Sequence, residues 1–210
     1  MQKEKYYIVM ADIIDSSDKA GESLMQHFKE MVASVNEELS EKIISPFTIT
    51  LGDEFQGIVN SLQTAVEVIF LMDEILLEAE QAYKLRFVIN FGVIDTPINR
   101  HQAYEMLGDG LTVARRTLGE LKSAESDILV AGIDKRVQEN LNMAFQLYRM
   151  IYDDWNSKDR PIARSFMKEP DYKKVAEAYS KDISTMWRRQ KSLKIDEFNI
   201  ARKLILNLST

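Results

Sequence analysis

Apolar and polar positions along the first 60 residues predict a strand, a helix and a hairpin. Residues 6–11 form a continuous apolar run with β-branched members, which predicts a buried strand. Residues 19–43 predict a helix that Pro46 ends, because their apolar side chains recur at helical spacing. Residues 47–51 and 55–59 flank Gly52, which predicts a β-hairpin whose turn presents Asp53 and Glu54.

The same kind of pattern continues to about residue 150. Ser61 suits the N-cap of a helix that runs to about residue 82. We expect further elements in this order: a strand over 85–94, a loop over 95–104, a helix over 111–122, a strand over 127–131, a helix over 134–141 and a strand over 145–151. This order predicts an α+β fold, with a mixed sheet and helices on one face.

The last third of the chain predicts a different architecture. Residues 153–171 are polar and contain Pro161 and Pro170, whereas residues 172–208 have an all-helical pattern. We therefore expect a first domain over residues 1–155, a linker over 156–171 and a small helical domain over 172–210.

The charge also divides the chain. Residues 1–159 hold 15 basic and 27 acidic residues, a net charge of −12, whereas residues 160–210 hold 12 and 6, a net charge of +6. Opposite charges suggest two modules with different partners. The alternative is a basic tail that docks on the acidic domain.

Composition excludes several classes of protein. The 210-residue chain has no cysteine, so it has no disulfide and no cysteine-ligated zinc. The most apolar helical stretch, residues 66–77, is too short and too charged to span a membrane, and the N-terminus lacks the apolar segment of a signal peptide. We expect a cytoplasmic protein with no membrane partner. His27 and His101 lack the partner spacing of a zinc site or a catalytic triad.

Two acidic residues are candidates for a metal site. Asp12 and Asp53 each lie at the edge of a strand-like apolar run. Two carboxylates a few ångströms apart repel each other by about 1–4 kcal/mol. A fold that brings them together usually binds a hard cation, of which Mg²⁺ on a nucleotide is the common case. The alternative is that both residues cap loops.

Four motifs in order give these acids a context. Ala11-Asp12-Ile13 is followed by Asp15-Ser16-Ser17, and then by Gly52-Asp53-Glu54-Phe55. A strand that ends near Gly92 follows, and then a turn at Gly108 that leads into a helix with Thr112 and Arg116 four residues apart. Over about 120 residues this resembles the palm-like catalytic domain of class III nucleotide cyclases, a fold shared with the GGDEF diguanylate cyclases.

The resemblance implies roles for individual residues. It implies Mg²⁺ ligands at Asp12, Asp53 and the Ile13 carbonyl, phosphate contacts at Asp15, Ser16 and Ser17, base and ribose contacts at Glu105 and Thr112, and transition-state charge stabilisation by Arg116 with Arg115 beside it. It also implies a nucleoside triphosphate ligand and a head-to-tail homodimer. For the two arginines the alternative is a solvated face or a salt bridge.

Two departures concern base and ribose recognition. Ile49 stands where cyclases carry an adenine-reading lysine, and Thr112 replaces the asparagine that positions the ribose. The resemblance therefore implies Mg²⁺–triphosphate binding and leaves adenylyl or guanylyl cyclase activity open.

The C-terminal part resembles a helix-turn-helix. Ser184 is a natural N-cap, and the second helix would enter the major groove of duplex DNA. The residues expected to face DNA are Ser184, Thr185, Arg188, Arg189 and Lys191. Trp187 departs from the pattern because small polar residues are usual there. The alternative is a helical hairpin used for dimerisation.

With both parts together, the whole chain is similar to the SatD family of bacterial proteins. The first hypothesis is a cytoplasmic regulator, in which a cyclase-like Mg²⁺–nucleotide domain is coupled to a DNA-binding helix-turn-helix. The second is an active nucleotidyl cyclase or transferase of unknown base specificity. The third is a non-catalytic dimeric scaffold with a vestigial site. Whether the protein is an enzyme stays open at this stage.

Overall fold

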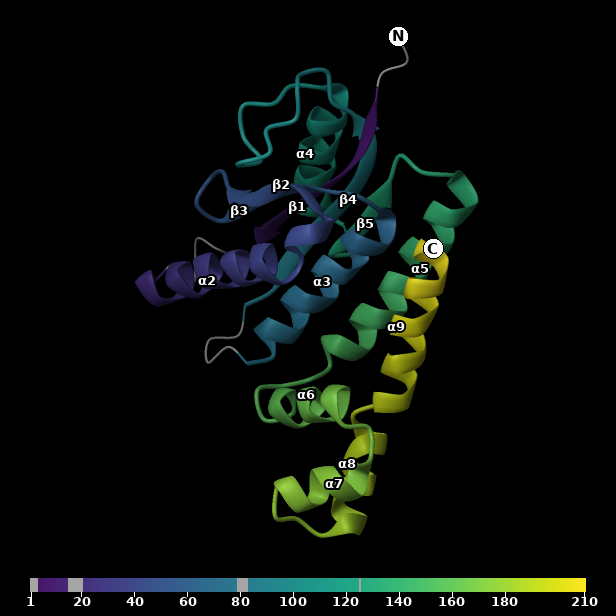
Figure 1. The fold of residues 1–210 in the computed structure, drawn as a ribbon. Helices are drawn as coiled ribbons and strands as arrows, with labels where there is room; N and C mark the ends of the chain where they lie inside the picture. The colour runs from purple at the N-terminus through teal and green to yellow at the C-terminus, as the bar shows by residue number, and fades with distance from the viewer. Residues whose placement is uncertain (1–3, 15–20, 79–82, 125) are drawn as a thin grey trace.

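A five-stranded mixed sheet forms the centre of the computed structural model, which describes residues 4–14, 21–78, 83–124 and 126–210 (Figure 1). The strand order is β2 (Ile43–Ile49), β3 (Glu54–Val59), β1 (Lys5–Ile13), β4 (Leu85–Val93), β5 (Ile128–Ala131). Strand β1 pairs antiparallel with both neighbours, and β5 joins parallel to β4. The predicted α+β class with a mixed sheet is confirmed.

Helices cover both faces of this sheet. Val9 and Ala11 of β1 face a core shared with α2 (Glu22–Glu38), α3 (Leu62–Leu76) and α5 (Lys135–Tyr152). Ile8 and Met10 face the opposite way, toward α4 (Asp109–Leu121). A strand covered on both sides is apolar at every position, which explains the continuous run of residues 6–11. The expectation that helices lie on one face only is therefore corrected.

Local signals fix the turns between these elements. Gly52 has φ +80° in the β2–β3 turn, a backbone conformation that favours glycine. The Ser61 hydroxyl accepts a hydrogen bond from the Thr64 amide at 3.1 Å, so the predicted N-cap of α3 is confirmed. At the start of α4, a Cβ on Gly110 would lie 2.6 Å from the backbone of Gly92. Helix α4 can approach β4 this closely only because both positions are glycine.

The strand predicted over residues 145–151 is wrong, because these residues form the second half of α5. The buried residues Leu141, Phe145, Tyr148 and Tyr152 recur at intervals of three and four, which is helical spacing. The predicted short helix over 134–141 is its first half. Asp134 caps it by accepting hydrogen bonds from the amides of residues 136 and 137.

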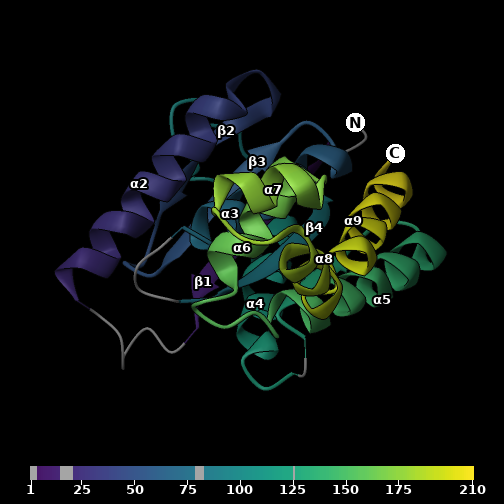
Figure 2. The ribbon, with the colours of Figure 1, turned by 90° about the horizontal axis from the view of Figure 1, so that it is seen from below.

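The segment expected to be a linker contains helix α6 (Arg160–Lys168), in which Ala163 and Phe166 are fully buried. Helices α7 (Tyr172–Ala178), α8 (Ile183–Ser192) and α9 (Ile195–Ser209) follow, and a short 3₁₀ turn over Ser40–Lys42 precedes β2. Helix α9 runs back antiparallel to α5, and the two helices lie side by side (Figures 1 and 2). One hydrophobic core therefore extends from the sheet to α9.

A buried ion pair ties α3 to α5. Asp73 is fully buried, and its carboxylate accepts hydrogen bonds from Arg149 at 3.1 Å and from the Tyr148 hydroxyl at 2.8 Å. Burial raises the pKa of Asp73, whereas the Arg149 charge and these hydrogen bonds lower it. The buried guanidinium of Arg149 therefore depends on Asp73 for its countercharge.

Within the described ranges, none of the helices is long and apolar enough to cross a membrane.

Candidate functional site

The Asp12 carboxylate lies at the end of β1, on the sheet face that α4 covers. In the antiparallel register Asp12 is directly opposite Arg86 of β4. The Arg86 guanidinium donates hydrogen bonds to both Asp12 oxygens, at 2.9 and 3.1 Å. The Lys122 ammonium lies 3.6 Å from the second of these oxygens. Asp12 and Arg86 are both buried, so this pair is largely shielded from solvent.

The backbone of Asp53, in the β2–β3 turn, lies next to the end of β1 that carries Asp12. The Ile13 amide donates a hydrogen bond to the Asp53 carbonyl at 3.0 Å. Burial raises the pKa of Asp12, the Arg86 and Lys122 charges lower it, and the Asp53 charge raises it slightly. Among the described residues, two acids therefore share one environment with two cations, and their formal charges cancel.

The Asp12 carboxylate faces a cation of the chain itself, which a magnesium ion at Asp12 would have to compete with. Mg²⁺ takes oxygen ligands at about 2.0–2.1 Å in octahedral geometry. Both Asp12 oxygens accept hydrogen bonds from Arg86, so a metal ion at Asp12 would compete with this guanidinium and be repelled by its charge. Among the residues the structure describes, no group of three or more acidic, histidine or cysteine side chains could hold a metal ion. The ligand roles of Asp12, Ile13 and Asp53 stay predictions.

Asp15, Ser16 and Ser17, the predicted phosphate contacts, lie outside the described residues.

A cavity of about 470 Å³ opens on the same sheet face, beside α4. We call it the α4 pocket. It is lined by Met10, Gln56, Tyr104, Glu105, Met106, Leu107, Gly108, Leu111, Thr112, Arg115 and Arg116. Its floor is the sheet, its wall is α4, and its rim is the loop that precedes α4. Four predicted site residues therefore line one cavity: Glu105 from the loop before α4, and Thr112, Arg115 and Arg116 from α4 itself.

The two arginines of the α4 pocket differ in their contacts. Arg115 forms an ion pair at 2.9 Å with Glu54, a largely buried side chain. Arg116 is 66% exposed, and its contact with Glu120 is 3.8 Å long and within one helical turn. Such exposed pairs contribute little energy. Arg116 is therefore free to turn toward an anion, and Arg115 is held in place at the rim.

Two other polar groups complete this pocket. The Thr112 hydroxyl donates to the Gly108 carbonyl at 3.3 Å, so it tightens the first turn of α4. Glu105 has φ 58°, a left-handed backbone conformation that is uncommon outside glycine. This backbone turn brings Glu105 to the pocket rim together with Tyr104 and Met106.

A sequence model of the SatD family matches residues 6–208. The chain belongs to the SatD family. The match spans the sheet and all the helices through most of α9. A comparison with curated proteins gives no match.

Solved structures similar to this SatD-family protein include nucleotide cyclase domains. One is the catalytic core of a rhodopsin-guanylyl cyclase with converted specificity, in complex with ATPαS. It has a TM-score of 0.43 at 15% identity, and the match covers 62% of this chain and 80% of the cyclase chain. A bacterial light-regulated adenylyl cyclase has a TM-score of 0.44 at 13% identity, and the match covers 61% of this chain and 43% of the cyclase chain. The guanylate cyclase domain of RhGC from Catenaria anguillulae, in complex with GTP, has a TM-score of 0.42 at 13% identity. This match covers 61% of this chain and 78% of the cyclase chain. Similarity this low transfers no activity.

The predicted DNA-facing residues lie on α8 of the SatD-family protein. Asp182, not Ser184, caps this helix, because its carboxylate accepts hydrogen bonds from the amides of residues 184 and 185. Arg189 forms an ion pair with Asp159. Lys191 likewise pairs with Asp196. These two cations are engaged within the chain, and DNA binding stays a prediction.

The other predicted residues of α8 lie at the surface. Thr185 and Arg188 are exposed, and Arg188 donates to the Ser184 hydroxyl at 3.3 Å. Trp187 is 47% exposed. The buried indole is instead Trp155, whose N–H donates to the Leu193 carbonyl at 2.9 Å.

The sequence did not single out Arg86, Lys122 or Gln56. Arg86 stands in a largely apolar strand, and a buried arginine needs a carboxylate partner. That was a usable signal. The identity of the partner depends on strand register, which the sequence leaves open.

Proposed function

We propose that this SatD-family protein binds a nucleotide in the α4 pocket through its phosphates, without a metal ion at Asp12, and acts as a sensor. The observation that carries the proposal is the meeting of Arg115 and Arg116 at a cavity of about 470 Å³. Ligand sites of small molecules measure about 300–1,000 Å³. The α4 pocket therefore has room for a nucleotide and two cations at its rim.

Phosphate recognition falls to the arginines. The planar guanidinium offers N–H donors in a fork that matches two phosphate oxygens. Arg116 is exposed and weakly held, so it reaches an incoming phosphate at little cost. Arg115 stays positioned by Glu54 and keeps donors for the ligand.

The remaining walls suit a base and a sugar. Met10, Met106 and Leu111 provide an apolar surface inside the cavity, and the half-exposed Tyr104 ring lies at its edge. The Glu105 carboxylate accepts hydrogen bonds and therefore favours a base that carries an amino group. This is the role that the cyclase resemblance implies for Glu105.

Asp12 supports a sensor in preference to a catalyst. Its oxygens are engaged by Arg86, so the carboxylate that would hold a catalytic metal is already neutralised. Nucleotidyl cyclase or transferase activity is the alternative, and it predicts release of pyrophosphate from a triphosphate. A vestigial scaffold is the other alternative, and it predicts no nucleotide binding.

Binding to the full-length protein tests the proposal. We expect at least one common nucleotide to raise the melting temperature, and Arg116→Ala to weaken its binding about 10- to 100-fold, since a hydrogen bond to a charged group contributes about 1.5–3 kcal/mol. Arg188→Ala is the matched control, because Arg188 is an exposed arginine on α8, and it should bind as wild type does.

Three results would count against this proposal. Absence of any shift at millimolar nucleotide favours the scaffold. Equal loss in the Arg188 control means nonspecific attraction. If the wild type releases pyrophosphate and Arg116→Ala abolishes this release, the nucleotidyl cyclase or transferase alternative is favoured.

A further inference from the structure

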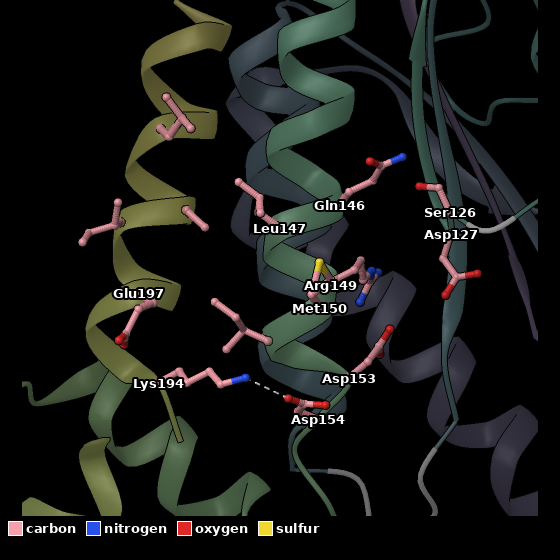
Figure 3. Close-up of a pocket in the computed structure, with 14 residues that line it drawn as sticks. Ser126, Asp127, Gln146, Leu147, Arg149, Met150, Asp153, Asp154, Lys194 and Glu197 are labelled. Atoms are coloured by element: carbon pink, nitrogen blue, oxygen red, sulfur yellow. Dashed lines mark hydrogen bonds and ion pairs between the residues drawn. The ribbon is translucent and has the colours of Figure 1, made fainter. Parts of the chain in front are cut away.

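Helices α5 and α9 lie side by side (Figures 1 and 2), and exposed apolar side chains extend over both of them. Five large side chains form this α5–α9 face: Met143, Leu147, Met150, Ile200 and Leu204. Each is 42–68% exposed. Figure 3 looks onto it and shows Leu147 and Met150 on α5, with Asp154 and Lys194 joined by an ion pair at one end. Monomers seldom expose a contiguous patch of this kind without a partner for it.

The outward stripe of α5 has an internal symmetry. Its members are Arg136, Asn140, Met143, Leu147, Met150 and Asp154, at alternating steps of four and three residues, so they follow one side of the helix and the turn after it. The stripe begins with the cation Arg136 and ends with the anion Asp154, which also pairs with Lys194 of its own chain, and its three central residues from Met143 to Met150 are apolar. If two copies of α5 lie antiparallel about residue 145, position 143 faces 147, position 140 faces 150 and position 136 faces 154.

We propose that the α5–α9 face binds a second copy of this chain, with α5 antiparallel to the α5 of the other copy. Such an interface is isologous, because the same patch is used on both subunits about a two-fold axis. Apolar residues then meet at the centre, and Arg136 meets Asp154 of the other copy at both ends. This charge pairing is why a second copy fits the face better than an unrelated apolar helix.

The packing behind the face favours this partner. Helices α5 and α9 already pack antiparallel through buried residues that include Tyr148 and Phe198, whose rings stack at 4.9 Å. Two such pairs placed face to face form a four-helix arrangement. A hollow of about 760 Å³ beside Leu147 and Met150 gives space for side chains of the other copy.

The size of the face predicts a weak dimer. Helix α5 has 18 residues, and at 1.5 Å per residue it is about 27 Å long. With α9 about 8–10 Å away, the strip is about 20 Å wide and covers roughly 540 Å² per subunit. This is near the lower limit for specific interfaces, so we expect a dissociation constant in the micromolar range.

Sedimentation velocity of the full-length protein at about 1–200 µM tests the proposal. We expect a monomer–dimer equilibrium, which Leu147→Glu abolishes by placing a charge beside the two-fold axis. Ile183→Glu is the matched control: it adds the same charge at an exposed apolar residue of α8 and should leave the equilibrium unchanged. Melting curves confirm that both variants are folded.

A charge exchange tests the antiparallel pairing itself. Arg136→Asp alone and Asp154→Arg alone should each weaken the dimer about tenfold, because each creates two like-charged contacts. The double variant should restore it. A wild type that stays monomeric throughout this range, a dimer that survives Leu147→Glu, or a double variant as weak as the single ones would overturn the proposal.

Discussion

Replacing Arg86 with glutamine should reveal how strongly the Asp12 carboxylate depends on it. Opposite unit charges 2.9 Å apart attract by about 6 kcal/mol at an effective dielectric of 20. Much of that attraction is offset by the cost of burial, and breaking a buried pair costs about 3–5 kcal/mol in practice. Lys122 remains 3.6 Å from Asp12 and compensates part of the loss. We therefore expect Arg86→Gln to lower the free energy of unfolding by about 2–4 kcal/mol at pH 7.5.

The pH dependence gives this prediction its sign. Arg86 lowers the pKa of Asp12 against the larger effect of burial, so its removal raises that pKa further above the unfolded value of about 3.9. Because the pKa of Asp12 is higher in the folded than in the unfolded state, protonation of Asp12 stabilises the folded protein. This stabilisation is complete below the unfolded pKa and is lost as the pH rises through the folded pKa. The deficit of Arg86→Gln should therefore be smaller near pH 4.5 than at pH 7.5.

Urea unfolding followed by circular dichroism at the two pH values measures this deficit. The Asp12→Asn/Arg86→Gln double variant completes the cycle, and we expect a coupling of at least about 1 kcal/mol at pH 7.5. An equal deficit at both pH values, or additive single effects, would refute the assignment of Arg86 as the countercharge of Asp12.

Two further substitutions test the frame around the site. Asp73→Asn leaves the Arg149 guanidinium buried without a carboxylate, so we expect urea unfolding to show a loss of about 3–5 kcal/mol. Gly110→Ala places a Cβ 2.6 Å from the backbone of β4, and thermal melts should show a loss of about 1–3 kcal/mol. Gly119→Ala on the same helix has open space and should be neutral or stabilising, and if it cost as much, close approach to β4 would not be the cause.

Much of the fold was predictable because burial and local chemistry agree with each other. Residues 6–11 are apolar throughout since both sides of β1 are covered, and Gly52 and Ser61 supply a turn and a cap that act locally. The helix within the predicted linker has a local explanation as well. Pro161 lies in the first turn of α6, where a missing N–H costs nothing, so the proline did not mark a break.

Exposed apolar residues on α5 explain why a strand was wrongly predicted over residues 145–151. A helix with one buried stripe shows polar residues between its apolar ones, but α5 carries a second apolar stripe on its outer side. The two stripes together make a nearly continuous apolar run, which is also typical of a buried strand. The misread segment is therefore the one for which we propose a partner.

The site was predictable only in part. The meeting of Glu105 with Thr112, Arg115 and Arg116 follows from their closeness in the chain and from the resemblance. The Asp12–Arg86 pair joins residues 74 positions apart and depends on the register of β1 against β4. A single sequence does not fix that register, so the countercharge at the predicted metal ligand could not be foreseen.

Isothermal titration calorimetry of the full-length protein, with the nucleotide that stabilises it most, tests the central claim most directly. The titration is run once in EDTA and once in excess Mg²⁺, for the wild type and for an Arg115→Ala/Arg116→Ala variant. Our account predicts wild-type affinities in the two buffers that agree within about threefold, or less than 1 kcal/mol, and no detectable binding by the variant. Binding by the wild type only in Mg²⁺, or binding that persists in the variant, would contradict it.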